Sequence, residues 1–311
     1  MSEEYKSGSK LERVLKSGQF AVTGECGPPR GADPEVIRKK CSLLKDKADA
    51  FNITDNQTSV VRMSSIASSV IMMQEGMEPV MQMVCRDRNR IAIQSDILGG
   101  AALGIKNMLC LSGDHQKFGD HPQSKNVFDL DSIQLIYTVK KMRDEHKFLG
   151  GEEIKGAPKL FIGAAENPFA DPFEIRVPRL AKKVAAGVDF IQTQCIFNVP
   201  KFEEWMKRVV DRGLHENVYI LGGLTPFKSF GMAKYMANNV PGMDVPEDLL
   251  KRMKDTPKEK QAEEGINIAV ETLERLKQIK GVDGVHIMAI EWEEKVGEIA
   301  QRGGLLPRPN L

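Results

Sequence analysis

The chain has 311 residues, of which 44 are basic and 43 acidic, so its formal net charge is +1. A nearly neutral chain creates no long-range field that would attract nucleic acid, and residues 1–6 lack the apolar core of a signal peptide. No segment approaches the roughly 18 apolar residues that a membrane span needs. We therefore expect a cytoplasmic protein with no membrane span and no nucleic-acid partner.

Eight short apolar runs predict strands, the first at 20–23 and the others at 49–56, 79–85, 107–113, 159–165, 190–196, 219–225 and 284–290. Most of the runs start about 30 residues apart, which is the length of a strand, a helix and two loops. Two intervals are longer. One holds a polar, Gly-rich loop at 113–126, and the other holds an extra charged helical region at 248–280.

The segments between the runs carry apolar residues at helical spacing. These residues are Val36, Cys41, Leu43 and Leu44; Ile91, Ile93, Ile97, Leu98 and Leu103; and Leu180, Val184 and Ala185. Strands that alternate with helices in this way predict an α/β fold, the (β/α)₈ TIM barrel, in a single domain at 20–311 after an N-terminal helical extension at 1–19. A doubly wound open sheet is the alternative, but no GxGxxG follows the first strand.

Five cysteines form no CxxC pair, so neither a disulfide framework nor a zinc ribbon is indicated. Two histidines, His115 and His121, lie near Asp114 and Asp120, but their spacing matches no standard metal site. We expect no bound metal.

In a (β/α)₈ barrel the chemistry lies at the carboxyl ends of the strands. Glu25 stands at the end of the first run, inside the stretch GECGPPR at 24–30, where glycine and two prolines stop the strand. It is a candidate general acid, and an ordinary turn carboxylate is the alternative. Asp114, Gln194 and the arginines of the stretch at 86–90 follow other strands. This set suits a polar heterocycle that carries anionic groups.

Six motifs occur in order along the strands: GECGPPR at 24–30, CRDRN at 85–89, LSGD at 111–114, AAG at 185–187, TQ at 193–194 and GVHI at 284–287. Together they resemble the methylenetetrahydrofolate reductase family over roughly residues 20–309. The resemblance implies a flavin-dependent barrel that reduces 5,10-methylenetetrahydrofolate to 5-methyltetrahydrofolate, in one-carbon metabolism and methionine biosynthesis. The length resembles the short bacterial form.

The resemblance also implies roles for individual residues. Glu25 matches the general acid that protonates N10 of the folate, and Asp114 matches a carboxylate beside the pyrimidine edge of the flavin. Gln194 and Phe230 match substrate contacts. Further flavin contacts are expected from Thr54 at the ring, Lys183 at the phosphate with help from Arg179 and Lys182, and from Arg86, Ser112, Gly113 and Ala165.

Two departures from the family pattern leave the cofactor open. Ser112 stands where an arginine supports the diphosphate of FAD, and Trp292 stands where an arginine lies near the substrate. The flavin is therefore FAD or FMN, and the electron donor is NAD(P)H or a separate electron-delivering subunit. We expect an oligomer or a hetero-complex. The alternatives are a folate-binding methyltransferase barrel, and a flavin subunit of a larger electron-transfer complex that does not use NADH directly.

Overall fold

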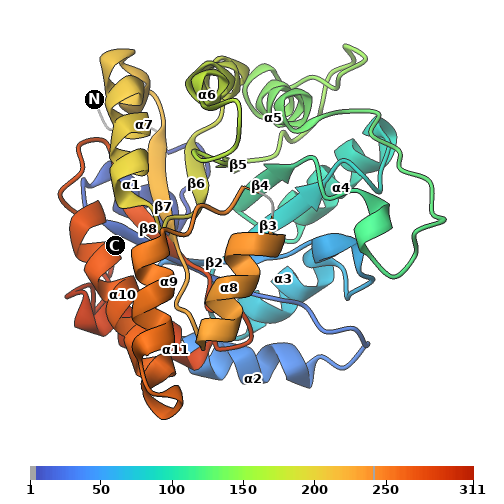
Figure 1. Ribbon diagram of the computed structural model, residues 1–311. Coiled ribbons are helices and arrows are strands. Elements are labelled where there is room, and N and C mark those ends of the chain that lie inside the picture. The colour runs from blue at the N-terminus through green and yellow to red at the C-terminus, as the bar shows by residue number, and fades with distance from the viewer. Residues whose placement is uncertain (1–4, 241) are drawn as a thin grey trace.

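The computed structural model describes residues 5–240 and 242–311, and within them eight parallel strands close into a barrel. Its order is β1 to β8, and β1 pairs with β8, so no strand edge stays open (Figure 1). This confirms the predicted single-domain (β/α)₈ barrel and excludes the open sheet. The strands are Ala21–Cys26, Ala50–Ile53, Pro79–Val84, Asn107–Leu111, Phe161–Glu166, Phe190–Cys195, Tyr219–Leu224 and Gly284–Ile287.

Helices surround the strands, and each predicted helical segment contains one (Figure 1). The predicted extra charged region at 248–280 forms two helices, α9 and α10. The helices α1 to α11 span Lys10–Lys16, Glu35–Leu44, Ser65–Gln74, Arg90–Ala102, Ser132–Lys140, Arg176–Ala186, Val199–Asp211, Phe230–Asn239, Glu247–Asp255, Gln261–Leu276 and Glu294–Arg302. None of the described helices is both long and apolar enough to cross a membrane.

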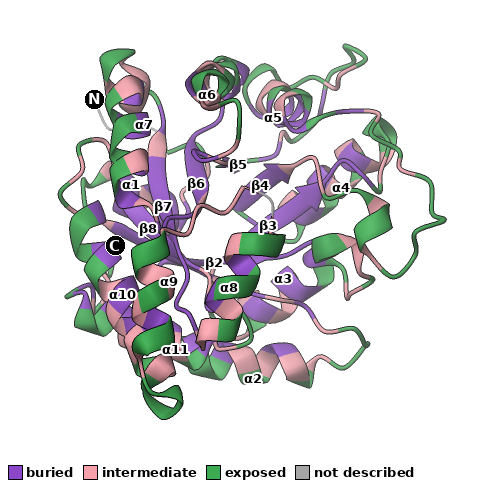
Figure 2. Cartoon of the chain, in the orientation of Figure 1, coloured by how far each residue is buried: buried purple, intermediate pink, exposed green. Residues whose placement is uncertain are grey.

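The strands read as continuous apolar runs because side chains cover both of their faces. All six residues of β3 are buried, and Figure 2 shows the buried class concentrated on the strands and on the inner sides of the helices. The helical spacing predicted where the helices lie, but it did not always predict which of their side chains are buried. Ile93 and Leu180 are buried as core residues, whereas Ile91 is 75% exposed and Ala185 is exposed.

Helix α1 closes the end of the barrel at which the strands begin. Its buried Leu11, Val14 and Leu15 share one apolar cluster with residues near the strand starts, including Phe161 and Phe190, whose rings stack. This end is therefore filled with side chains of the described residues, which leaves the opposite end of the barrel for a ligand. Residues 1–4 of the expected extension lie outside the described residues, and the division of the chain after residue 19 stays a prediction.

Candidate active site

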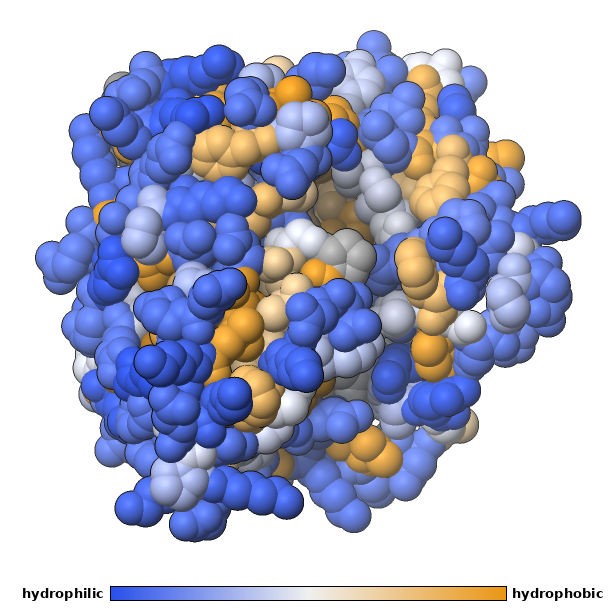
Figure 3. Space-filling view, in the orientation of Figure 1, coloured by the Kyte–Doolittle hydropathy of each residue, from blue (hydrophilic) through white to orange (hydrophobic). Residues whose placement is uncertain are grey.

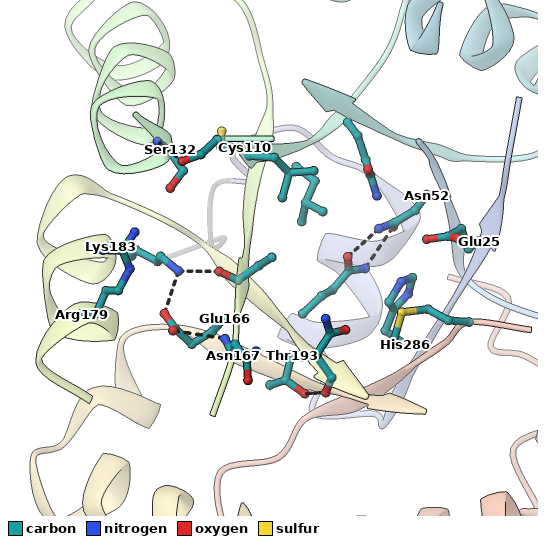
Figure 4. A pocket seen from close by; sticks show the side chains of 18 of the residues that line it. Glu25, Asn52, Cys110, Ser132, Glu166, Asn167, Arg179, Lys183, Thr193 and His286 are labelled. Carbon is teal, nitrogen blue, oxygen red and sulfur yellow. Dashed lines mark hydrogen bonds and ion pairs between the residues drawn. The ribbon is translucent and has the colours of Figure 1, made fainter. Parts of the chain in front are cut away.

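A cavity of about 330 Å³ opens at the carboxyl ends of the strands. In the space-filling view the centre of this face is hollowed (Figure 3). Figure 4 shows Glu25, Asn52 and His286 at one end of the cavity, and Glu166, Arg179 and Lys183 at the other. We call these the acid end and the basic end.

Glu25 is a carboxyl group at the acid end with a strongly shifted pKa. It belongs to β1 itself, so the strand runs further than the predicted 20–23 and ends at Cys26, before Pro28. Burial raises the pKa of the Glu25 carboxyl to about 7, against the attraction of Lys40 and with repulsion from Glu293. A carboxyl that holds its proton near neutral pH can donate it to a ligand.

Beneath Glu25 the barrel interior holds a hydrogen-bonded polar network. The Asn52 and Gln192 amides pair reciprocally at 2.6 and 3.0 Å. Gln192 Nε2 also donates to Thr23 Oγ1 at 3.1 Å, and that oxygen lies 3.0 Å from His286 Nδ1. Burial lowers the pKa of His286 to about 3, so its ring is neutral at pH 7. The network fixes three cavity-lining side chains in one arrangement.

At the basic end a buried ion pair forms one wall of the cavity. Lys183 Nζ lies 2.7 Å from Glu166 Oε2 and also donates to the Ala165 carbonyl oxygen. Desolvation lowers the pKa of Lys183, and the Glu166 carboxylate opposes that shift. The charge of Lys183 is therefore already balanced within the chain.

Arg179 is the cation that remains available at this end. It is exposed, it lines the cavity, and it makes no hydrogen bond or ion pair with the residues that the structure describes. Its neighbour Arg176 donates to the carbonyl oxygens of Asp171 and Pro172. An anionic group of a ligand would meet the Arg179 guanidinium with all of its donors available.

Two other predicted residues line the cavity between its ends. Ser112 Oγ accepts from the backbone N–H of Ser132 at the start of α5, at 3.1 Å. Gln194 reaches the cavity from β6, where the pairing with β7 shifts register between Gln192 and Cys195. With Ala165, Glu25, Arg179 and Lys183, they make six predicted site residues that the fold brings to one cavity.

Arg86 does not line this cavity. Its guanidinium donates to Asp87, to Ser59 Oγ and to the carbonyl oxygens of Asn56 and Asp114, at 2.7 to 3.2 Å. These bonds occupy all five of its N–H groups. The structure thus places Arg86 as a clamp between loops, with no donor left for a cofactor.

Five further predicted residues also lie outside the cavity lining. Asp114 and Lys182 are exposed, and Phe230 lies at the start of α8, in a groove formed with α9. Gly113 adopts φ +90°, and a Cβ there would lie 3.0 Å from Val84 Cβ, so the turn after β4 needs a glycine. Thr54 is 1% exposed, and its Oγ1 is buried without a hydrogen-bond partner in the described part of the chain.

The sequence analysis assigned no role to several side chains that line the cavity: Asn52, Gln82, Glu166, Asn167, Arg176, Gln192 and His286. Three of them, Asn52, Gln192 and His286, stand inside buried strands, and Asn52 and His286 are the single polar side chains of β2 and β8. A polar residue in the middle of a buried parallel strand needs a hydrogen-bonding partner inside the barrel. That signal was present in the sequence and would have found them.

The model of the family described as "Methylenetetrahydrofolate reductase" matches residues 10–304. Methylenetetrahydrofolate reductase 2 of Schizosaccharomyces pombe is 26% identical over 242 residues, which are 73% of this chain and 36% of that protein. The 5,10-methylenetetrahydrofolate reductase of Salmonella typhimurium is 23% identical over 296 residues, which are 93% of each chain. The chain spans about a third of the length of the Schizosaccharomyces pombe relative and nearly all of the Salmonella typhimurium relative.

Among solved structures, an uncharacterized protein from Clostridium thermocellum that binds two copies of 5-methyl-5,6,7,8-tetrahydrofolic acid has a TM-score of 0.64. It is 13% identical, and the match covers 96% of this chain and 99% of that one. Tryptophan synthase from M. tuberculosis, with a TM-score of 0.53 at 12% identity, matches 96% of this chain and all of that one. At these identities the likeness concerns the fold alone. The family match over nearly the whole chain decides the assignment: this chain belongs to the methylenetetrahydrofolate reductase family.

Proposed function

We propose that this chain reduces 5,10-methylenetetrahydrofolate to 5-methyltetrahydrofolate by hydride transfer from a reduced flavin, with Glu25 as the general acid. The observation that carries the proposal is the Glu25 carboxyl at the acid end, whose pKa burial raises to about 7. Family membership supports the reaction and its folate substrate.

The proton on Glu25 has a defined task in this reaction. The imidazolidine ring of the substrate opens when the bond between its methylene carbon and N10 breaks, which leaves a cationic iminium at N5. Protonation of N10 by Glu25 makes that nitrogen a better leaving group. Hydride addition to the methylene carbon then completes the methyl group. The flavin supplies the hydride.

Two features of the chain bear on a flavin. Thr54 Oγ1 is a buried oxygen that finds no partner among the described residues, but it lies outside the cavity lining, so its contact with the flavin ring stays a prediction from the resemblance. Arg179 is an unpaired cation at the far end of a cavity of about 330 Å³, where a phosphate would be stabilised. We assign Arg179 to that phosphate. The roles of Asp114, Lys182 and Phe230 stay predictions, and Arg86, whose N–H groups are all occupied within the chain, is not assigned to the flavin.

Stopped-flow measurement of the two half-reactions of Glu25→Gln tests the proposal. We expect the reduction of the flavin by its donor to persist and the oxidation of the reduced flavin by the folate to slow by about 10²- to 10⁴-fold, because only that step needs a proton at N10. The matched control is Glu291→Gln, an exposed carboxylate outside the cavity lining. Equal losses in both half-reactions would mean that Glu25 positions the flavin instead.

The same preparation tests the remaining expectations. Mixing the oxidised protein with NADH or NADPH alone decides between a nicotinamide donor and a separate electron-delivering subunit. Native mass spectrometry decides whether the protein is an oligomer or part of a hetero-complex. A protein that binds 5-methyltetrahydrofolate and no flavin would favour the methyltransferase alternative and refute the proposed reduction.

A further inference from the structure

A part-buried ion pair lies at the end of β1, outside the cavity lining. Lys40 Nζ, on α2, is 2.6 Å from Glu293 Oε1, and Glu293 stands immediately before α11. The same Nζ donates to the Gly27 carbonyl oxygen at 3.1 Å, two residues after Glu25. Lys40 therefore joins α2 and the start of α11 to the turn that follows Glu25.

The two charges of this pair act on Glu25 through space. Burial raises the pKa of the Glu25 carboxyl, the Lys40 ammonium opposes that rise, and the Glu293 carboxylate adds to it. The Lys40 and Glu293 side chains are 24% and 11% exposed, so water and salt screen their charges less than those of a surface pair. Each charge thus offsets part of the effect that the other has on the same proton.

The remaining titratable groups around this carboxyl add no net charge at pH 7. Burial raises the pKa of the Cys26 thiol on β1 to about 12 and that of the Cys195 thiol on β6 to about 11. The ring of His286 on β8 is neutral, because burial lowers its pKa to about 3. At the end of β2, Asp55 is paired with Arg88 at 2.7 Å.

We propose that Glu293 is a positioning residue for the acid: it neutralises Lys40, which the Gly27 carbonyl oxygen holds at the end of β1, so that Glu25 keeps its proton near pH 7. This rests on the proposed role of Glu25 as the general acid. Lys40 alone would favour the carboxylate form of Glu25, which has no proton to give to a substrate. Because neither Lys40 nor Glu293 lines the cavity, both act through Glu25 and not through contact with a ligand.

The first experiment titrates Glu25 directly, because the proposal predicts opposite effects of the two charges. The full chain is prepared with ¹³C-labelled glutamate, and the Glu25 carboxyl signal is assigned by its loss in Glu25→Gln. We expect the midpoint of its titration to fall by about 0.5 to 1 pH unit in Glu293→Gln and to rise by about as much in Lys40→Met. In the double variant Lys40→Met/Glu293→Gln it stays within about 0.3 pH unit of the native value.

The matched control is Glu298→Gln, which breaks the ion pair with Lys295 within α11 and leaves the Glu25 midpoint unchanged. Thermal unfolding of every variant reports any loss of folded structure. Midpoints that stay in place, or that move in the same direction in the two single variants, would overturn the proposal. The pair would then support the fold only.

The second experiment follows the same proton through stopped-flow rates of the two half-reactions between pH 5.5 and 9. We expect the pH above which the folate half-reaction slows to move with the Glu25 midpoint, so that Glu293→Gln is about 2- to 6-fold slower at pH 7. Reduction of the flavin by its donor keeps its native rate. Midpoints that move as expected while the folate half-reaction does not follow them would refute Glu25 as the general acid, and with it the proposed function.

Discussion

Removal of one member of the buried ion pair at the basic end measures how much this pair contributes to the stability of the protein. In Lys183→Met the Glu166 carboxylate, whose side chain is 2% exposed, loses its counter-charge, and the Ala165 carbonyl oxygen loses a donor. Breaking a buried pair from one side costs about 3–5 kcal/mol because the remaining charge stays desolvated. We expect the free energy of unfolding to fall by that amount.

The double variant Glu166→Gln/Lys183→Met removes both charges at nearly constant volume, and its glutamine still accepts from the Asn167 N–H. Desolvation already lowers the pKa of Lys183 despite the nearby carboxylate, so the attraction in the pair does not fully offset the cost of burying it. We therefore expect the double variant to lose less than about 2 kcal/mol and to be more stable than Lys183→Met alone.

Urea unfolding followed by tryptophan fluorescence measures these differences, and the fully buried Trp205 serves as the reporter. The comparison holds if the dependence of the unfolding free energy on urea is the same in all variants. A loss below about 1 kcal/mol in Lys183→Met would refute the buried pair. A double variant whose loss equals the sum of the losses in Lys183→Met and in the single variant Glu166→Gln would refute it as well, because the two residues would then act independently.

Three further predictions concern the acid end, the cofactor and the turn after β4. Since the pKa of Glu25 is raised from 4.5 to about 7, its contribution to stability is complete below pH 4.5 and is lost as the pH rises through 7, which unfolding measured over a pH series checks. For the same reason the folate half-reaction slows about tenfold per pH unit above 7, which stopped-flow rates over the same pH series check. FMN binds at least comparably to FAD, because Lys183 is paired and Arg179 matches one phosphate; reconstitution with each flavin measures the two affinities, and a site that accepts only FAD would contradict this. Gly113→Ala destabilises the protein by about 1–3 kcal/mol, because its φ of +90° and the contact with Val84 both oppose a Cβ; thermal unfolding against Gly99→Ala, which has open space, checks it.

The barrel was predictable because buried parallel strands leave a simple trace in the sequence. Each of the eight apolar runs overlaps one strand, although β1 and β5 continue past their runs, and the intervals between the runs contain most of the helices. The inner faces of the helices were harder to predict. Ala185 and Leu43 follow the helical spacing but are exposed, because a short helix on a barrel contacts its neighbours over a narrow stripe.

The site was predictable only in part, because residue type and position on a strand do not show how a side chain is already engaged. Arg86 follows a strand like a phosphate ligand, yet its donors bind Asp87 in its own loop and the loops after β2 and β4. Lys183 lies on the cavity as expected, but no sequence pattern placed Glu166 against it. Contacts between residues far apart in the chain decide such cases, and they appear only once the fold is known.

The clamp formed by Arg86 makes one side of the mouth of the barrel more rigid than the other. One guanidinium joins the loops after β2, β3 and β4, and the backbone of the same residue accepts from Val127 and donates to Ser112. None of these loops can shift alone without breaking bonds in the others. The loops after β2, β3 and β4 therefore form the rigid side of the mouth. Any movement that admits a ligand or releases a product falls to the loops after β5 to β8.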